Sequence, residues 1–411
     1  MIDEIIKKIK DTLLNSGKVA EYSDDELLEN IEAHLLNEIN TLGKYFDINE
    51  KTEIIDRVYS SIRGYGPLDY ILKDDSITEV MINGYNDIFI ERNGKLIKSN
   101  SKFEDNKRLE DIIQKIVGKS GREVNQANPI VDTRLEDGSR VNVVLPPISL
   151  NGPVVTIRKF SKEPMTIEKL IGYGSITQEI ADKLEILVKS KFNIIVSGGT
   201  GSGKTTFLNA LSNFIPKTER IITIEDSAEL QIVGIENLVR LETRNANTAK
   251  VGEVSIRDLI KSSLRMRPER IIVGEVRGKE AIDMLQAMNT GHDGSLSTAH
   301  ANSTKDMLSR LETMVLMGSE GLPLEAIRQQ IASSVDIIIQ LSRFRDKSRR
   351  VQAISEIVGM KDGQVQLNTL YEFEEDENST LHKVSGSLVR KSKSLINTYK
   401  LTISGYSADI I

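Results

Sequence analysis

One short run of glycines constrains what this chain can fold into more than any other feature of its sequence. An apolar stretch at residues 193–197 leads into Gly198-Gly199-Thr200-Gly201-Ser202-Gly203-Lys204-Thr205-Thr206, and a helical pattern follows. Glycines let consecutive backbone N–H groups turn toward one anion, and a helix N-terminus adds its positive dipole at the same point. The G-x-x-x-x-G-K-[ST] spacing between a strand and a helix therefore predicts a loop that binds nucleotide phosphates.

Two side chains at the end of this run have predicted roles of their own. Lys204 is expected to contact the β and γ phosphates. Thr205 is expected to place its hydroxyl on Mg²⁺, which keeps most of its waters and takes few protein ligands beside the phosphates. The alternative, an ordinary glycine-rich turn, is disfavoured by four glycines, a lysine and a threonine in register. Residues 198–206 are the predicted site for ATP and Mg²⁺.

Apolar strands and helical periodicities alternate around this loop. Strands are expected at residues 193–197, 220–225, 270–276 and 295–300. Between them, apolar residues recur at helical spacing, as at 256–264 and 282–288. This alternation predicts an α/β domain, residues 176–371, with a parallel sheet and helical crossovers.

An acidic residue lies near the end of the predicted strand at 270–276. Parallel sheets present catalytic groups at the ends of their strands, and hydrolysis needs a positioned carboxylate. Glu275 is therefore the candidate for orienting or deprotonating the attacking water, with a surface acid as the alternative. Gly274 stands where many phosphate-loop ATPases carry an aspartate for magnesium, so the metal must be held differently.

A second acidic group follows the predicted strand at 220–225. It consists of Glu225 and Asp226, with Glu229 four residues after Glu225. One of them is expected to reach metal or water at the same edge of the sheet, and Glu225 is the candidate for the catalytic and metal-binding roles. Spacing does not decide among the three, and a solvated acidic turn is equally favoured for Asp226 and Glu229 taken singly.

Histidines and arginines supply the remaining candidates. His292 and His300 flank the predicted strand at 295–300. This position favours a γ-phosphate-sensing role and a structural role about equally. Arg140 and Arg158 lie in β-like runs of the preceding domain. If that domain folds over the nucleotide, both arginines could neutralise phosphate charge.

The rest of the chain divides into segments with different sequence patterns. Residues 1–63 show helical periodicity, and residues 64–158 show short strands and turns, with a hairpin expected at Asn93-Gly94. A linker is expected at 159–175. Residues 372–411 are expected to form a peripheral extension. The predicted architecture is an α/β nucleotide-binding domain preceded by a smaller mixed α/β domain and a helical segment.

Composition excludes several classes of protein. The 411 residues include no cysteine, which rules out disulfides, cysteine-ligated zinc and a thiol nucleophile and favours a cytosolic location. No apolar run approaches the roughly 20 residues of a spanning helix, so membrane association is expected to be indirect. A net charge of −6 and 5% aromatic residues argue against nucleic acid as the main partner.

Taken in order, these motifs resemble the secretion ATPase superfamily of type II and type IV systems, and most closely its CpaF-type branch, the tight-adherence (Flp) pilus ATPases. Four boxes match: the Walker A loop at 198–205, the acidic box at 224–230, the Walker B segment ending at 274–278 and the histidine box at 291–301. Segments 66–68, 77–84, 311–317 and 328–332 extend the resemblance to about residues 60–370. The absence of cysteine argues against the type II branch that carries a four-cysteine zinc module.

The resemblance implies a hexameric ring in which each subunit pairs an N-terminal α/β domain with a RecA-like ATPase domain. It implies Glu275 as the catalytic glutamate, His292 and His300 as histidine-box residues, and Arg140 and Arg158 as nucleotide-contacting arginines. The function expected is that of a cytoplasmic motor ATPase at the inner membrane, acting on a platform protein in pilus assembly or protein secretion. The alternatives are a retraction or export ATPase, a RecA-like DNA translocase, or a nucleotide-gated binding protein without useful turnover.

Overall fold

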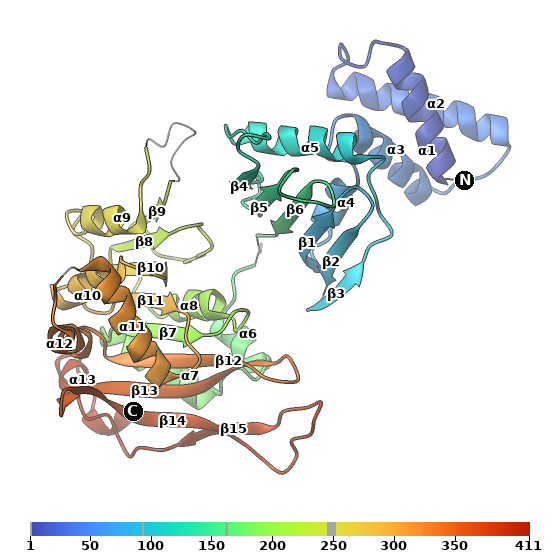
Figure 1. The fold of residues 1–411 in the computed structure, drawn as a ribbon. Helices are drawn as coiled ribbons and strands as arrows, with labels where there is room; N and C mark the ends of the chain where they lie inside the picture. The colour runs from blue at the N-terminus through green and yellow to red at the C-terminus, as the bar shows by residue number, and fades with distance from the viewer. Residues whose placement is uncertain (1, 93, 161–162, 245–251, 320) are drawn as a thin grey trace. The chain divides into compact units, whose positions relative to one another are not determined.

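The computed structural model describes residues 2–92, 94–160, 163–244, 252–319 and 321–411, which form two compact units, 1–162 and 163–411 (Figure 1). The predicted turn residue Asn93 and part of the predicted linker, residues 161–162, lie outside the described ranges. Among the described residues, no helix has the length and apolar character needed to cross a bilayer.

The first unit begins with three helices that bury one apolar stripe each. Their shared core contains Ile9, Leu27, Ile31 and Ile54 among others. Capping boxes define two of the helix starts. The side chains of Ser23 and Asp47 each accept the amide of the glutamate three positions on, and the side chain of that glutamate accepts the amide of the cap residue. The helices are α1 (Ile2–Asn15), α2 (Asp24–Leu42) and α3 (Ile48–Ile62).

A six-stranded antiparallel sheet completes the first unit, in the order β3-β2-β1-β6-β5-β4. Apolar residues of α4 and α5 pack with the inward residues of the strands in one core. The elements are α4 (Pro67–Lys73), β1 (Ile77–Asn83), β2 (Ile88–Arg92), β3 (Lys95–Lys98), α5 (Asn106–Lys119), β4 (Ile130–Arg134), β5 (Arg140–Val144) and β6 (Val154–Arg158). Arg92 and Lys95 pair across the predicted hairpin.

The second unit is built on a nine-stranded sheet in the order β15-β14-β13-β12-β7-β11-β10-β8-β9. The strands from β12 to β9 in this order run parallel, which confirms the predicted parallel sheet with helical crossovers. The strands are β7 (Ile194–Gly198), β8 (Ile221–Glu225), β9 (Leu238–Glu242), β10 (Arg270–Val276), β11 (Leu296–Ala299), β12 (Ile337–Arg343), β13 (Arg349–Lys361), β14 (Gln364–Glu375) and β15 (Gly386–Arg390).

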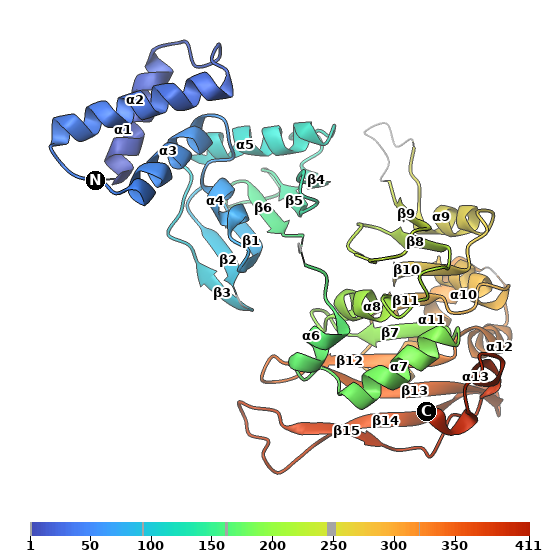
Figure 2. The same cartoon turned by 180° about the vertical axis from the view of Figure 1, so that it is seen from behind.

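Helices cover both faces of this sheet. Ile194 and Val196 of β7 pack in the core with α7 and α8, whereas Ile195 packs in the core on the other face, with α9 to α12. Figures 1 and 2 show these two helical layers from opposite sides. The helices are α6 (Ile167–Gly172), α7 (Gln178–Lys189), α8 (Lys204–Ser212), α9 (Ile256–Ser263), α10 (Ala281–Asn289), α11 (Thr304–Gly318), α12 (Leu324–Ser334), α13 (Tyr399–Ile403) and the 3-10 helix Ala408–Ile410.

The structure differs from the sequence expectations at two boundaries. The expected linker at 159–175 contains α6, which begins after Thr166 because the Thr166 side chain accepts the Lys169 amide. The expected boundary at 371/372 falls inside β14. Residues beyond it form part of the sheet, and Leu395 and Leu401 are buried in the core of the second unit, so segment 372–411 is not peripheral. The apolar side chains that hold this segment against the core are spaced too widely to form a periodic pattern in the sequence.

Candidate active site

The glycine run is a loop that joins β7 to α8. Gly201 and Gly203 adopt φ angles of 73° and 90°, which side chains disfavour. A Cβ on Gly198 would lie 2.4 Å from Ser202 Oγ and 2.7 Å from the Leu341 carbonyl oxygen. Helix α8 starts without a side-chain cap, so its first amides are available to an anion. The backbone therefore has the form that phosphate binding needs.

Lys204, the first residue of α8, lies against this loop. Its Nζ donates to the Gly199 carbonyl oxygen at 3.2 Å and lies 3.3 Å from His300 Nδ1. The side chain is buried, and burial lowers the pKa of the ammonium group, with the Glu275 carboxylate opposing that shift. Burial makes the charged form of an ammonium group costly, so an anion placed beside Lys204 would stabilise it.

Glu275 is held between a histidine and an arginine at the end of β10. Its Oε1 lies 2.6 Å from His300 Nε2, and its Oε2 accepts a hydrogen bond from Arg277 Nη2 at 2.6 Å. Burial is the main cause that lowers the pKa of His300; Lys204 and Arg277 act in the same direction and Glu275 opposes them. The imidazole is therefore mostly neutral near pH 7. The contacts run from Lys204 through His300 to Glu275.

Glu225, at the end of β8, is almost completely buried next to Gly274. Its Oε2 accepts the amides of Glu229 and Leu230 at 2.7 and 2.9 Å, whereas its Oε1 is buried without a hydrogen-bond partner among the described residues. A Cβ on residue 274 would lie 2.9 Å from Glu225 Cγ. Glycine at 274 thus makes room for Glu225, which explains why no aspartate stands there.

The residues around the loop fit a magnesium ion. A buried carboxylate oxygen without a partner favours a cation, and Mg²⁺ prefers oxygen ligands. Thr205 is half-buried in the first turn of α8. Glu225 and the Thr205 hydroxyl are therefore the candidate protein ligands.

The protonation of Glu225 gives a first testable prediction. Burial is the main cause that raises the pKa of Glu225 to about 7, against the two amide hydrogen bonds. Because the folded chain holds this proton more tightly than the unfolded chain, the stabilisation is complete below about pH 4.5 and is lost as the pH rises through 7. Its size is about 3 kcal/mol.

We therefore expect the unfolding midpoint of the wild type to fall, relative to that of Glu225→Gln, between about pH 5 and pH 8. Glutamine has no proton to lose and can still accept the two amides through its carbonyl oxygen. Denaturant unfolding of both proteins at several pH values measures the difference. Parallel profiles would show that Glu225 is not protonated in the folded chain.

The structure brings some of the other predicted residues to the loop and not others. His300 follows β11 at the edge where β7 enters the loop, whereas His292 precedes β11 at the opposite edge, with Nδ1 3.3 Å from the Ala287 carbonyl oxygen. The sensing role of His292 stays a prediction. Arg140 and Arg158 belong to the first unit and are directly opposite each other on β5 and β6.

Two arginines near the site had no role predicted from the sequence. Arg277 contacts Glu275 and also lies 3.8 Å from Asp226 Oδ2. Arg349 donates from Nε to the Gly201 carbonyl oxygen at 2.9 Å. A helpful signal for Arg277 was its position two residues after Glu275. Arg349 gave no such signal, because it lies 148 residues away from its partner in the chain.

The glycine-rich loop lies at the edge of a parallel sheet, and one histidine contacts both the lysine of that loop and the glutamate at the end of a neighbouring strand. These features define the class of protein: an α/β nucleotide hydrolase with a RecA-like fold.

The profile of the family described as "Type II/IV secretion system protein" matches residues 62–391. Among similar proteins, conjugal transfer protein TrbB of Rhizobium radiobacter is 33% identical over 311 residues, covering 75% of this chain and 92% of TrbB. Type IV secretion system protein PtlH of Bordetella pertussis is 33% identical over 265 residues, covering 59% of this chain and 78% of PtlH. The chain belongs to this family, and it is an ATPase.

Solved structures show a similar fold. The ATPase DotB of Legionella pneumophila covers 71% of this chain and 79% of its own length, with a TM-score of 0.52 and 20% identity. The pilus retraction motor PilT covers 82% of this chain and 85% of its own, with a TM-score of 0.51 and 17% identity. The predicted resemblance to the secretion ATPase superfamily is confirmed, and its CpaF-type branch stays a prediction.

Proposed function

We propose that the chain is the cytoplasmic motor of a pilus or secretion system, working as a ring of six copies on the inner face of the cytoplasmic membrane. It hydrolyses ATP and passes domain motion to an inner-membrane platform protein, with indirect contact to the bilayer and no nucleic-acid substrate. Within the family, the proposal is a CpaF-type ATPase of pilus assembly. The support is the series of four sequence boxes and the geometry around the phosphate loop.

The observation that carries the proposal is the arrangement of Lys204, His300 and Glu275. Glu275 lies at the sheet edge that carries the phosphate loop, where it can accept a proton or hydrogen bond from the attacking water. Water forms a bond to the γ phosphorus as the bond from that phosphorus to the bridging oxygen breaks, and ADP leaves. The water proton passes to Glu275 and then to phosphate or solvent.

The remaining residues of the loop bind and orient the substrate. Backbone amides of Gly198, Gly199, Thr200, Gly201, Ser202 and Gly203, with those of Lys204, Thr205 and Thr206, surround the phosphates. Lys204 balances negative charge on the β and γ phosphates. Thr205 and Glu225 are the proposed protein ligands of Mg²⁺, which would neutralise phosphate charge when bound.

Arg140 and Arg158 are the proposed arginines that the first unit contributes. They are directly opposite each other on β5 and β6, and Glu79 of β1 is directly opposite Arg158 on its other side. Asp132 lies 3.7 Å from Arg140. Such a pair suits the phosphates of a nucleotide.

Replacing either arginine by alanine is expected to lower the ATPase kcat at least about tenfold, because the developing phosphate charge loses a cation. The unfolding temperature should change little, because neither arginine is buried. Hydrolysis assays and thermal unfolding measure both. Arg92→Ala, on β2 of the same sheet, is the control. Normal kcat in Arg140→Ala and Arg158→Ala would remove both from the site.

Hydrolysis by the full chain alone, with single-stranded DNA, and with membranes that carry a platform protein tests the function. Stimulation by the membranes supports the motor. Stimulation by DNA alone would favour a translocase, and negligible hydrolysis in every arm would favour a nucleotide-gated binding protein.

A further inference from the structure

The turn between β12 and β13 lies against the phosphate loop. Strand β12 pairs with β7 so that Leu341 is opposite Gly198. Arg349, the first residue of β13, donates from Nε to the Gly201 carbonyl oxygen at 2.9 Å. A Cβ on Gly203 would lie 3.5 Å from Arg349 Cδ. Arg349 therefore lies beside two glycines whose φ angles define the loop.

A cavity of about 360 Å³ lies between this turn and the loop. One side is formed by residues of the loop and α8, such as Gly203 and Thr206, and another by the segment around α6, including Leu170 and Tyr173. Arg349 is part of the third side. The cavity combines apolar walls with cations, which suits the ribose and base of a nucleotide whose phosphates occupy the loop.

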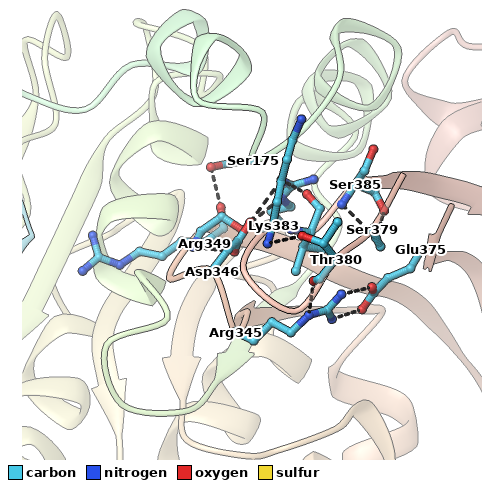
Figure 3. A network of polar contacts seen from close by, with 12 residues as sticks. Ser175, Arg345, Asp346, Arg349, Glu375, Ser379, Thr380, Lys383 and Ser385 are labelled. Carbon is cyan, nitrogen blue, oxygen red and sulfur yellow. Dashed lines mark hydrogen bonds and ion pairs between the residues drawn. The ribbon is translucent and has the colours of Figure 1, made fainter. Parts of the chain in front are cut away.

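Arg349 has donors left for a ligand. Its backbone is fixed, because the Ser175 hydroxyl donates to its carbonyl oxygen at 2.7 Å. Its two terminal guanidinium nitrogens make no hydrogen bond or ion pair within the part of the chain that the structure describes. Figure 3 shows the side chain extended away from the turn. A guanidinium group stays charged and can bond to two oxygens at once.

A polar network ties the turn to the loop between β14 and β15 (Figure 3). Asp346 accepts the Ser348 amide and hydroxyl at 2.9 and 2.6 Å through Oδ1, and the Val384 amide at 2.9 Å through Oδ2. Arg345 forms a two-pronged contact with Glu375 and donates to the Thr380 carbonyl oxygen at 2.9 Å.

These contacts stabilise an ionised Asp346. Burial alone would raise its pKa, but the hydrogen bonds from Ser348 and Val384 and the nearby Arg350 outweigh it and lower the pKa to about 2. Asp346 is therefore ionised, and its hydrogen bonds hold the turn three residues before Arg349. The β14–β15 hairpin, far from the loop in sequence, fixes the conformation that presents Arg349.

We propose that Arg349 binds the nucleotide through its terminal nitrogens, and that Asp346, anchored on the β14–β15 hairpin, is a positioning residue that acts through Arg349. The inference rests on the proposed nucleotide site. It adds to the ATPase site a binding residue and a supporting hairpin that lie outside the four sequence boxes.

The test is calorimetric titration of the full-length protein with ADP and Mg²⁺, together with ATPase kinetics. Arg349→Ala should raise the Kd for ADP and the KM for ATP about tenfold, with kcat changed less than about threefold. Arg349→Lys should restore little, because a lysine has one donor nitrogen, whereas arginine contacts Gly201 through Nε and presents two further nitrogens to the nucleotide. Lys361→Ala, at the far end of β13, is the control and should bind ADP like the wild type.

Asp346→Ala should raise the Kd for ADP about threefold in the wild type and not at all in the Arg349→Ala background. A general loss of structure would lower kcat as well and would persist in that background. If thermal unfolding shows that Asp346→Ala is not folded, Glu375→Gln replaces it. In each background, Glu375→Gln is expected to change the Kd for ADP by the factor given for Asp346→Ala. Wild-type ADP affinity in Arg349→Ala, or an undiminished Asp346 effect in the double variant, would overturn the inference. Failure of the wild type to bind ADP would instead contradict the nucleotide site itself.

Discussion

Glu275→Gln is expected to lower kcat by about 10²- to 10⁴-fold while ATP still binds. Glutamine keeps the shape of the side chain and an oxygen for Arg277, so the contacts at the end of β10 are largely preserved. What it loses is the carboxylate that orients the water and takes its proton. Single-turnover hydrolysis and an ATP-binding titration on the same preparation measure the two effects separately.

The matched control is Glu236→Gln, which changes an exposed acid before β9 in the same way. It should hydrolyse ATP at the wild-type rate. Near-normal turnover by Glu275→Gln would remove Glu275 from the chemistry and leave Glu225 as the strand-end carboxylate to examine next.

Lys204→Ala is expected to abolish both nucleotide binding and turnover. The ammonium group is the only lysine cation of the phosphate loop, and a charge-assisted contact to phosphate is among the stronger interactions in a protein. We expect the Kd for ATP to rise at least about tenfold, and hydrolysis to fall below detection at ordinary ATP concentrations. Equilibrium binding with ATP and Mg²⁺ measures the first effect, and phosphate release measures the second.

Lys305→Ala, an exposed lysine of α11, is the control for loss of one positive charge. The two active-site variants should differ from each other: Glu275→Gln binds ATP and Lys204→Ala does not. If Lys204→Ala bound ATP as tightly as the wild type, the loop at residues 198–206 would not be the main phosphate site.

The parts of the fold predicted from sequence are those in which the signal is local. The phosphate loop carries its own conformational requirement, since Gly201 and Gly203 need φ angles that other residues avoid. The buried parallel strands are continuous apolar runs, so the alternation of strands and helices was visible. The position of Glu275 beside the loop could be predicted because strand ends in such sheets lie at one edge.

The rest depended on contacts between segments far apart in the chain. Spacing did not decide among Glu225, Asp226 and Glu229, and the close approach of Glu225 to Gly274 is visible only in three dimensions. His292 and His300 looked equivalent in sequence, yet they lie at opposite ends of β11. Strand β14 and the buried Leu395 make segment 372–411 part of the core, although its charged composition indicated a peripheral tail.

The proposal that the ATPase drives a membrane machine is tested most directly by copurification from the membranes of its own cells. Tagged Glu275→Gln, held with ATP, is extracted in mild detergent beside tagged Lys204→Ala, and the retained proteins are identified by mass spectrometry. We predict one multi-spanning inner-membrane protein that is retained more strongly by Glu275→Gln than by Lys204→Ala. Recovery of nucleic acid in place of any membrane protein, or the same membrane proteins with both variants, would contradict the account.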